Sequence, residues 1–374
     1  MRVALFSGNY NYVREGANQA LNRMAAYAED NGHEVRAYSP VTDTPAFEPE
    51  GELVAVPSIQ LPVRGEFRLA LGLPEAIRRD VRRFAPDVIH VSTPDILGTR
   101  AQTLAKRMGV PLIASLHTRF ETYFEHYGLG WGRPLAEAHL RRFYRRSDHV
   151  LAPTPATVDE IKALRGDDGV GLWSRGVDRD RFAPARRDLQ WRRAMGWADG
   201  DVVLLFFGRL VLEKGVGEFV SLIQQLRQRG VGVHALVVGE GPARDRFDGL
   251  EGAVLTGHLD GDELGRAIAS ADILLHPSRT EAFGNVVLEA MASGLAVVCA
   301  DADSARSLVK DGRSGLLYSA GDESELLDAL AAVVRDADRR RALGRAAREA
   351  SARFSWDAAS QSVLDAYEQL VSSL

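Results

Sequence analysis

The chain has 374 residues, of which 45% are hydrophobic and 26% are charged, and it carries a net charge of −5. This length predicts two domains, and the composition is typical of a soluble globular α/β protein. The negative charge argues against nucleic-acid binding. The single cysteine, Cys299, excludes a disulfide framework and indicates a reducing compartment.

No stretch of about 18 apolar residues predicts a transmembrane helix, and the first residues become polar too early for a signal peptide. We therefore expect a cytoplasmic protein. The nine histidines are scattered and show no spacing typical of a metal site.

Short β-rich runs alternate with helical patterns along the chain. We expect strands in the first half at 2–8, 34–40, 87–93, 111–117 and 149–153, and in the second half at 201–209, 233–241, 253–259, 271–278 and 295–301. Strands that alternate with helices form parallel sheets with helical crossovers. The predicted fold is therefore α/β, with two doubly wound, Rossmann-like sheets.

A charged segment that contains Pro184 separates the two halves and predicts a domain boundary. The predicted domains are residues 1–180 and 181–357. Ligands of open α/β sheets bind beyond the carboxyl ends of the strands. Two such domains that face each other therefore predict a binding cleft.

The tail of the chain has a helical pattern. Val363, Tyr367 and Leu370 recur at helical spacing. We expect a helix over 358–374 that packs back onto the first domain.

The segment SRTEAFGNVVLEAM places a loop between a predicted strand and a predicted helix. Glu281 falls in the loop, and Glu289 lies just over one turn into the helix. Between them, Phe283, Gly284 and Asn285 form a helix N-terminus, whose unpaired amides attract anions. This arrangement predicts a phosphate at the amides, a ribose at Glu289, and the group attached to the phosphate at Glu281. The structural alternative is a solvated loop glutamate and a capping charge.

The segment FFGRLVLEKGVGEF places two cations beside glycines. Arg209 follows a predicted strand, and Lys214 precedes the next helix. Cations flanked by glycines suit the close approach of the backbone to a diphosphate. A surface lysine in a solvated loop is the alternative, since the spacing differs from that of a GxxxxGK[ST] phosphate loop.

Two residues of the first half are also candidates. Gly16 lies where the chain passes from the first strand toward a helix, and its role is either a turn or an approach to phosphate. No GxGxxG follows that strand, which argues against a nicotinamide dehydrogenase. His117 ends a predicted strand at the ligand edge, where a structural and a functional role are both open. Asp301-Ala302-Asp303 matches the short DxD pattern of metal-dependent sugar transferases and is kept as a minor alternative.

The motifs GRLVLEKG, VVGEGPARDRF, TGHLDGDELGRAIASADILLHPSRTEAFGNVVLEAMASGLAVV and DGRSGLLYSAGD follow one another in the second half. With them, the chain resembles family 4 of the retaining glycosyltransferases, which have the GT-B architecture. The resemblance covers nearly the whole chain. Through STPDILGTRAQTLAKRMGVPLIASLHTRFETYFEHYGLG and LWSRGVDRDRFAP, the first half is most similar to enzymes that glycosylate membrane lipids, such as sulfoquinovosyl-diacylglycerol synthases and related mannosyl or glucuronosyl lipid transferases.

The resemblance implies a role for each candidate in the second half. Arg209 and Lys214 would hold the donor diphosphate. Glu289 would bind the nucleotide ribose, and Glu281 would lie near the anomeric carbon of the sugar. The family needs no metal and no cofactor beyond its donor substrate.

In the first half, the resemblance implies that Gly16 lets the first loop approach the phosphates. It also implies that His117 contacts the sugar near its C6 substituent. The catalytic residues implied are then His117, Arg209, Lys214 and Glu281.

Two basic runs, at residues 64–84 and 133–146, are either solvated faces or a surface for anionic lipid. In the first run, Ile77, Val81 and Phe84 form a core-facing stripe. That stripe leaves four arginines facing outward: Arg78, Arg79, Arg82 and Arg83.

The predicted function is retaining, metal-independent transfer of a sugar from a nucleotide diphosphate sugar to a membrane lipid at the inner face of the cell membrane. A UDP-sugar is expected ahead of a GDP-sugar. Three alternatives stay open: a soluble or polysaccharide acceptor, a nucleotide-sugar epimerase of the same architecture, and a non-enzymatic nucleotide-sugar binding module. The oligomeric state is open as well.

Overall fold

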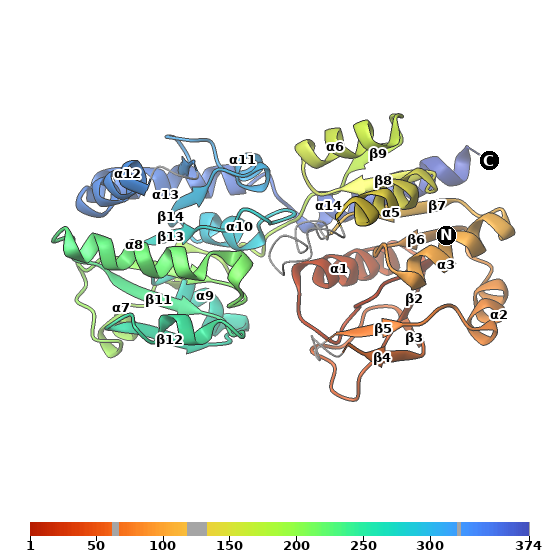
Figure 1. Ribbon diagram of the computed structural model, residues 1–374, viewed down its shortest axis with the longest axis horizontal. Coiled ribbons are helices and arrows are strands. Elements are labelled where there is room, and N and C mark those ends of the chain that lie inside the picture. Colours follow the sequence, from red (N-terminus) through yellow and green to blue (C-terminus); the bar gives the residue numbers. More distant parts are fainter. Residues whose placement is uncertain (62–66, 118–132, 320–322, 374) are drawn as a thin grey trace. The chain divides into compact units, whose positions relative to one another are not determined.

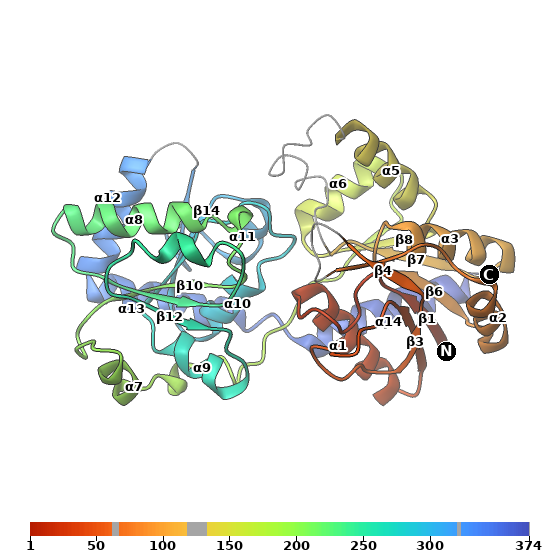
Figure 2. The same ribbon diagram turned by 60° about the horizontal axis from the view of Figure 1, so that its bottom comes forward.

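A computed structural model describes residues 1–61, 67–117, 133–319 and 323–373. The chain forms two compact units (Figures 1 and 2). The first joins Met1–Gly176 to Trp356–Leu374, and the second is Val177–Ser355. Each unit is built on a parallel sheet that helices cover. The prediction of an α/β protein with two doubly wound sheets is confirmed.

In the first unit, the described residues form a seven-stranded parallel sheet in the order β3-β2-β1-β6-β7-β8-β9. Its strands are β1 (Arg2–Phe6), β2 (Glu34–Ser39), β3 (Glu52–Ala55), β6 (Val88–Val91), β7 (Leu112–Ser115), β8 (His149–Ala152) and β9 (Val170–Leu172). Every residue of β1 after Arg2 is buried, as expected for a strand covered on both faces. Strands β4 (Ser58–Gln60) and β5 (Arg68–Ala70) pair separately in an antiparallel ladder.

The helices of the first unit come from both ends of the chain. They are α1 (Gly16–Asp30), α2 (Glu75–Phe84), α3 (Ile96–Met108), α5 (Arg133–Arg145), α6 (Pro155–Arg165) and α14 (Trp356–Ser372). Helix α14 lies beside α1 in Figures 1 and 2, and both helices share a core with β1. Val363 and Tyr367 are fully buried in that core, and Leu370 packs at its margin.

Helix α2 has the two faces that the sequence predicts. Ile77, Val81 and Phe84 are buried, whereas the arginines lie on the outer side, with Arg78 half-buried and the other three exposed. Glu75 in the first turn pairs with Arg78 and Arg82 at 3.3 and 2.9 Å. Residues 64–66 of this basic run lie outside the described residues.

In the second unit, the described residues form a six-stranded parallel sheet in the order β12-β11-β10-β13-β14-β15. Its strands are β10 (Val203–Phe207), β11 (His234–Val238), β12 (Ala253–Gly257), β13 (Ile273–His276), β14 (Ala296–Ala300) and β15 (Leu316–Tyr318). Its helices are η2 (Pro184–Arg186), α7 (Leu189–Ala194), η3 (Leu212–Lys214), α8 (Val216–Gln228), η4 (Arg244–Phe247), α9 (Gly261–Ala269), α10 (Asn285–Ala292), α11 (Asp303–Leu308), α12 (Glu323–Arg335) and α13 (Ala337–Ser351).

Strand β10 shows how this sheet is covered. Leu204 and Phe206 enter a core built with α8 and α12, while Val203 and Leu205 enter the core on the opposite face, built with α9 and α10. Because side chains alternate along a strand, one strand supplies both cores. Cys299 of β14 is fully buried in the second of them, and burial raises the pKa of its thiol.

Five short strands were not predicted: β3, β4, β5, β9 and β15. They are short and few of their residues are fully buried, so their sequence pattern is too brief to identify a strand. They add to the sheets without changing the fold class.

Each sheet reverses its strand order once. In the first unit the reversal lies between β1 and β6, and in the second it lies between β10 and β13. Ligands of open α/β sheets bind at such switch points, outside the carboxyl ends of the strands. The loops after β10 and β13 are therefore the place to look for chemistry in the second unit. None of the helices within the described residues is both long and apolar enough to span a bilayer.

Candidate active site

Two predicted site residues, Lys214 and Glu281, form an ion pair in the second unit. Lys214 Nζ lies 2.5 Å from Glu281 Oε1. Lys214 ends η3, after β10, and Glu281 lies in the loop after β13. Because β10 and β13 are neighbours at the switch point, their carboxyl ends bring the two side chains together. The side chains are 27% and 17% exposed, so both remain within reach of a ligand.

Gly215 sets how closely the two loops approach each other. It stands at the start of α8 with a φ of +76°, a conformation that favours glycine. A Cβ atom at this position would lie 2.7 Å from Cβ of Pro277, the residue that follows β13. Glycine therefore lets the loop that carries Lys214 pack directly on the loop that carries Glu281.

His276, the last residue of β13, is a site residue that sequence reasoning missed. Its Nε2 lies 3.6 Å from Glu281 Oε1 and has no hydrogen-bond partner among the described residues. Burial lowers the pKa of His276 to about 4, so its ring is neutral at pH 7. Burial opposes the ionisation of Glu281, but Lys214, His276 and Ser278 together outweigh burial and lower the pKa of Glu281 to about 2. The signal that could have found His276 is its place at the end of a strand.

A second group of side chains braces the loop that carries Glu281. Arg279, two residues earlier, donates to both carboxylate oxygens of Glu218 in α8, at 2.9 and 3.2 Å. The hydroxyl of Tyr318 donates to Glu218 at 3.0 Å, and the Arg279 guanidinium lies 5.8 Å from the centre of the Tyr318 ring. The loop is thus tied to α8 and to β15.

Helix α10 begins at the predicted place. Gly284 is its N-cap, and no side chain among the described residues caps the helix start. Val287 is the first residue whose amide bonds back within the helix, to the carbonyl of Gly284 at 3.0 Å. The amides of Asn285 and Val286 precede it, and they supply the donors and the partial positive charge of a helix N-terminus.

The remaining predicted residues of this unit lie around the same strand ends. The side chain of Phe283 is buried against Phe354, so only its backbone is left for a ligand. Glu289 is half-buried in the second turn of α10. Arg209 is half-buried directly after β10, the strand that also precedes Lys214.

In the first unit, Gly16 is the first residue of α1. It follows the N-cap Glu15, whose side chain forms a capping box with Asn18. The loop after β1 meets the loop after β6 at Gly8 instead: its amide donates to Thr93 Oγ1 at 2.9 Å. Sequence reasoning missed Gly8, which lies at the switch point of this sheet.

His117 lies two residues beyond β7, at the predicted edge of the sheet. Its Nε2 lies 2.7 Å from Ser115 Oγ, and its Nδ1 lies 2.9 Å from Nη2 of Arg175. Burial, and then the charge of Arg175, lowers the pKa of His117 well below 6.5. Both ring nitrogens are therefore engaged by the protein. The residues that follow His117 in the resemblance motif, 118–130, lie outside the described residues.

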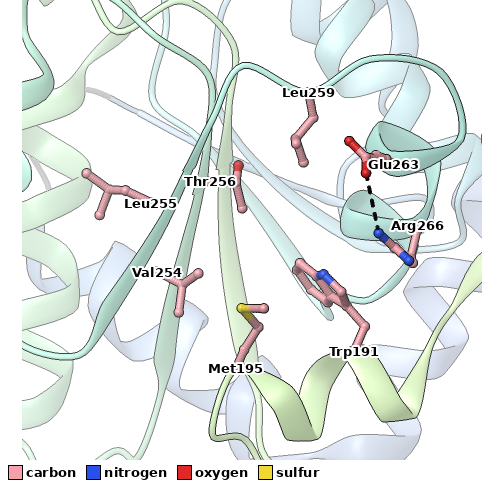
Figure 3. Close-up of a pocket in the computed structure, with 8 residues that line it drawn as sticks. All are labelled: Trp191, Met195, Val254, Leu255, Thr256, Leu259, Glu263 and Arg266. Carbon is pink, nitrogen blue, oxygen red and sulfur yellow. Dashed lines mark ion pairs between the residues drawn. The ribbon is translucent and has the colours of Figure 1, made fainter.

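The cavity in Figure 3 is separate from these residues. It has a volume of about 330 Å³ and lies between β12, α7 and α9, with Trp191, Val254 and Thr256 on its walls. None of the site residues predicted from the sequence lines it. The two aspartates of the DxD pattern, Asp301 and Asp303, both pair with Arg306, at 2.6 and 3.2 Å.

Comparisons with known proteins identify the family of the chain. The model of Glycosyltransferase Family 4 matches residues 14–181, and that of Glycosyl transferases group 1 matches residues 201–336. The chain is 34% identical to a GDP-mannose-dependent alpha-mannosyltransferase of Mycobacterium tuberculosis, with 98% of this chain and 96% of that one covered. It is 30% identical to the sulfoquinovosyl transferase SQD2 of Arabidopsis thaliana, with 97% and 72% covered.

Solved structures show the same fold. Sucrose-phosphate synthase from Thermosynechococcus elongatus superposes with a TM-score of 0.79 at 19% identity, over 100% of both chains. Anabaena Alr3699/HepE in complex with UDP and glucose gives a TM-score of 0.76 at 20% identity, over 99% of this chain and 100% of that one. The resemblance seen in the sequence is confirmed: this chain is a glycosyltransferase and belongs to family 4, with the GT-B fold.

Proposed function

We propose that the protein transfers a sugar, with retention and without a metal ion, from a nucleotide diphosphate sugar to a membrane lipid. The observation that carries the proposal is the pair Lys214–Glu281 at the switch point between β10 and β13. A cation and a carboxylate 2.5 Å apart, next to an uncapped helix start, suit a ligand that is anionic on one side and hydroxylated on the other.

The roles follow from the charges and positions. Lys214 and Arg209 bind the diphosphate together with the amides at the start of α10. Glu289 accepts hydrogen bonds from the ribose, and Glu281 faces the sugar. In the first unit, Gly16, at the start of α1, lets the preceding loop approach the phosphates, and His117 contacts the sugar. These groups take over the charge neutralisation that a metal ion provides in other transferases, so no metal or other cofactor is needed.

The leaving diphosphate gains negative charge as the glycosidic bond breaks, and the site must stabilise that charge. One aimed hydrogen-bond donor contributes about 3 to 4 kcal/mol to such stabilisation, and a helix terminus up to about 2 kcal/mol. Before the donor binds, Glu281 neutralises Lys214. A bound diphosphate then competes for Lys214, and Glu281 becomes available to the sugar hydroxyls.

Two routes give retention. In one, the acceptor attacks on the face that the diphosphate leaves, and a phosphate oxygen takes its proton. In the other, Glu281 forms a covalent intermediate, as retaining glycosidases do. Mass spectrometry of the quenched enzyme separates the two routes, because only the second leaves a glycosyl adduct on Glu281.

Substitution tests the catalytic assignment. Lys214→Ala and Glu281→Gln should each lower kcat by roughly 10²- to 10³-fold, because each removes one group aimed at the reacting centre. Circular dichroism and the unfolding midpoint should show that both variants fold. Lys310→Ala removes an exposed lysine of the same unit and should leave kcat unchanged. Turnover by Glu281→Gln at the wild-type rate would show that the assignment is wrong.

A panel of donors tests the substrate class. The relatives named above act on different donors, GDP-mannose by name in one case, so the panel contains UDP- and GDP-sugars with a host lipid extract. A new glycolipid, identified by mass spectrometry, supports the proposal. Donor conversion without acceptor would identify an epimerase, and donor binding without conversion would identify a binding module. Transfer only to a soluble glycan would contradict the lipid acceptor.

Helix α2 supports the lipid acceptor. Its exposed arginines project away from its buried stripe, and each basic residue near an anionic membrane contributes about 1 kcal/mol. Reversing the charge at Arg79, Arg82 and Arg83 to glutamate should therefore lower partitioning to anionic vesicles more than a hundredfold. Vesicle flotation at low salt measures this loss. The same reversal at Arg339, Arg341 and Arg345 of α13 is the control, and equal losses in both variants would remove α2 as the docking surface.

A further inference from the structure

A continuous chain of buried hydrogen bonds runs through the first unit to His117. Oη of Tyr367 lies 2.6 Å from Nδ1 of His90, whose Nε2 lies 2.7 Å from Oγ of Ser115. The same Oγ lies 2.7 Å from Nε2 of His117, and Nδ1 of His117 lies 2.9 Å from Nη2 of Arg175. Tyr367, His90 and Ser115 are at most 1% exposed. The chain thus links α14 to the end of β7 through β6.

One placement of hydrogens satisfies the whole chain. A guanidinium only donates, so Nδ1 of His117 accepts from Arg175 and the proton of a neutral His117 sits on Nε2. That N–H donates to Ser115, whose hydroxyl then donates to Nε2 of His90. His90 therefore carries its proton on Nδ1 and donates to Tyr367. The two histidines are neutral, they hold opposite tautomers, and every bond points away from Arg175.

The last donor of the chain also has an acceptor. The hydroxyl of Tyr367 lies 3.7 Å from the sulfur of Met24 in α1. The hydroxyl of Tyr10 is the other titratable group that acts on Tyr367, and it donates to the carbonyl of Glu50 at 2.8 Å. The donors and acceptors of the chain are therefore matched from end to end.

Arg175 already places one positive charge beside this hydrogen-bond chain, and the surroundings disfavour a second. Arg175 is 3% exposed, donates to the carbonyls of Trp173 and Ser174, and lies 5.1 Å from the centre of the Trp173 ring. No carboxylate pairs with Arg175 in the part of the chain that the structure describes. Burial lowers the pKa of His90 to about 3, and burial, Arg175 and His90 together lower that of His117.

We propose that Ser115, His90 and Tyr367 are positioning residues that fix the ring orientation and the neutral tautomer of His117. The role of this hydrogen-bond chain in sugar transfer rests on the function proposed above, in which His117 contacts the sugar. The ring of His117 is held at both nitrogens and stands edge-on to Trp173, with centroids 5.0 Å apart. A sugar that binds at His117 therefore meets an imidazole ring whose orientation is fixed. Among the residues that fix it is Tyr367, from the distant helix α14.

The hydrogen placement is tested without any substrate. ¹⁵N spectra of the histidine rings in the full-length chain should show His117 protonated on Nε2 and His90 protonated on Nδ1. Neither ring should titrate between about pH 7.5 and 5, whereas an ordinary histidine titrates near 6.5. Identical tautomers in the two rings, or titration of His117 near 6.5, would overturn the proposal.

The positioning role is tested with a matched pair of tyrosine variants. Tyr367→Phe leaves the Nδ1–H of His90 without an acceptor, so the ¹⁵N signals of His90 should shift and kcat should fall roughly tenfold with the donor KM unchanged. Tyr27→Phe removes another hydroxyl that bonds to α14, 2.8 Å from Gln361, and should change neither the tautomers nor kcat. A shift of the His90 signals in Tyr367→Phe with unchanged kcat would show that the hydrogen-bond chain is merely structural.

The two proposals fail in different ways. If Lys214→Ala and Glu281→Gln remain fully active while the ¹⁵N spectra show the expected tautomers, the proposed function is wrong and the hydrogen-bond chain stands. If those variants lose activity while His117 titrates like an ordinary histidine, the proposed positioning of His117 is wrong and the proposed function stands.

Discussion

Three histidines are kept neutral by burial, and each has consequences that reach beyond its own contacts. The pKa of His90 is lowered to about 3, that of His276 to about 4, and that of His117 well below 6.5. In the unfolded chain each ring takes up a proton near pH 6.5, and in the folded chain it does not. The stability that these rings contribute is therefore complete above pH 6.5 and is lost as the pH falls toward their folded pKa values.

His90 gives the clearest measurement of this effect. When the pH falls from 6.5 to 5, each histidine that stays neutral in the folded state lowers the free energy of unfolding by about 2 kcal/mol. The difference in unfolding free energy between wild type and His90→Gln should therefore shrink by that amount over this interval. Urea denaturation at the two pH values measures it.

At the scale of residues, the sequence identified the charged groups but not their neutral partners. Lys214 and Glu281 could be predicted because their motifs place them after strands, where polar side chains meet a ligand. His276 also stands at the end of a strand. The spacing of the histidines predicts no metal site, so the sequence alone does not single it out. The surroundings of His117 could not be foreseen, since Arg175 reaches it from a distant segment and Tyr367 is linked to it only through His90 and Ser115.

Among the elements, the turn at Gly215 needs a glycine for two reasons. An alanine there must adopt a left-handed conformation, at a cost of about 1 to 2 kcal/mol, and its Cβ would lie 2.7 Å from Pro277. We expect Gly215→Ala to lower the unfolding free energy by at least that amount and to lower kcat, because the loops of Lys214 and Glu281 are forced apart. Chemical denaturation and initial rates measure the two effects.

The neighbouring Gly217 provides the control for that turn. It lies inside α8, and a Cβ there would meet no atom within 4 Å. Because alanine favours a helix interior more than glycine does, Gly217→Ala should be neutral or slightly stabilising, with unchanged kcat. If both variants behave alike, the close approach at Gly215 is not what positions the loops.

Burial explains which elements the sequence could predict. Strands such as β1 and β10 consist almost entirely of buried apolar residues, which is the pattern of a strand covered by helices on both faces. The strands at the edges of the sheets, β3 and β9 among them, have few neighbours to cover them and therefore no comparable pattern. The start of α10 was predictable because Gly284 marks it, whereas the brace formed by Arg279, Glu218 and Tyr318 depends on three separate segments.

In the whole molecule, the first unit is assembled from the two ends of the chain. Helix α14 contributes Val363, Leu364 and Tyr367 to the core that it shares with α1. Three such side chains contribute roughly 5 to 8 kcal/mol by burial, which is comparable to the entire stability of a domain. The first unit therefore depends on residues that follow the second unit in the sequence.

Truncation tests this dependence. A chain that ends at Ser355 should lose hydrogen-exchange protection in β1 and β6, while β10 and β11 of the second unit keep theirs, because they draw on separate cores. A chain that ends at Val371 retains the buried residues of α14 and should match the full-length protein. Uniform loss of protection in both units of the shorter chain would contradict the assignment of α14 to one unit.

The burial of Cys299 gives the experimenter a natural probe. It is the only thiol of the protein, and it lies inside β14 with no exposed surface. A reagent such as a disulfide dye can react with it only when that half of the molecule opens. The rate of dye release then reports the opening of the second unit by itself, without an introduced label.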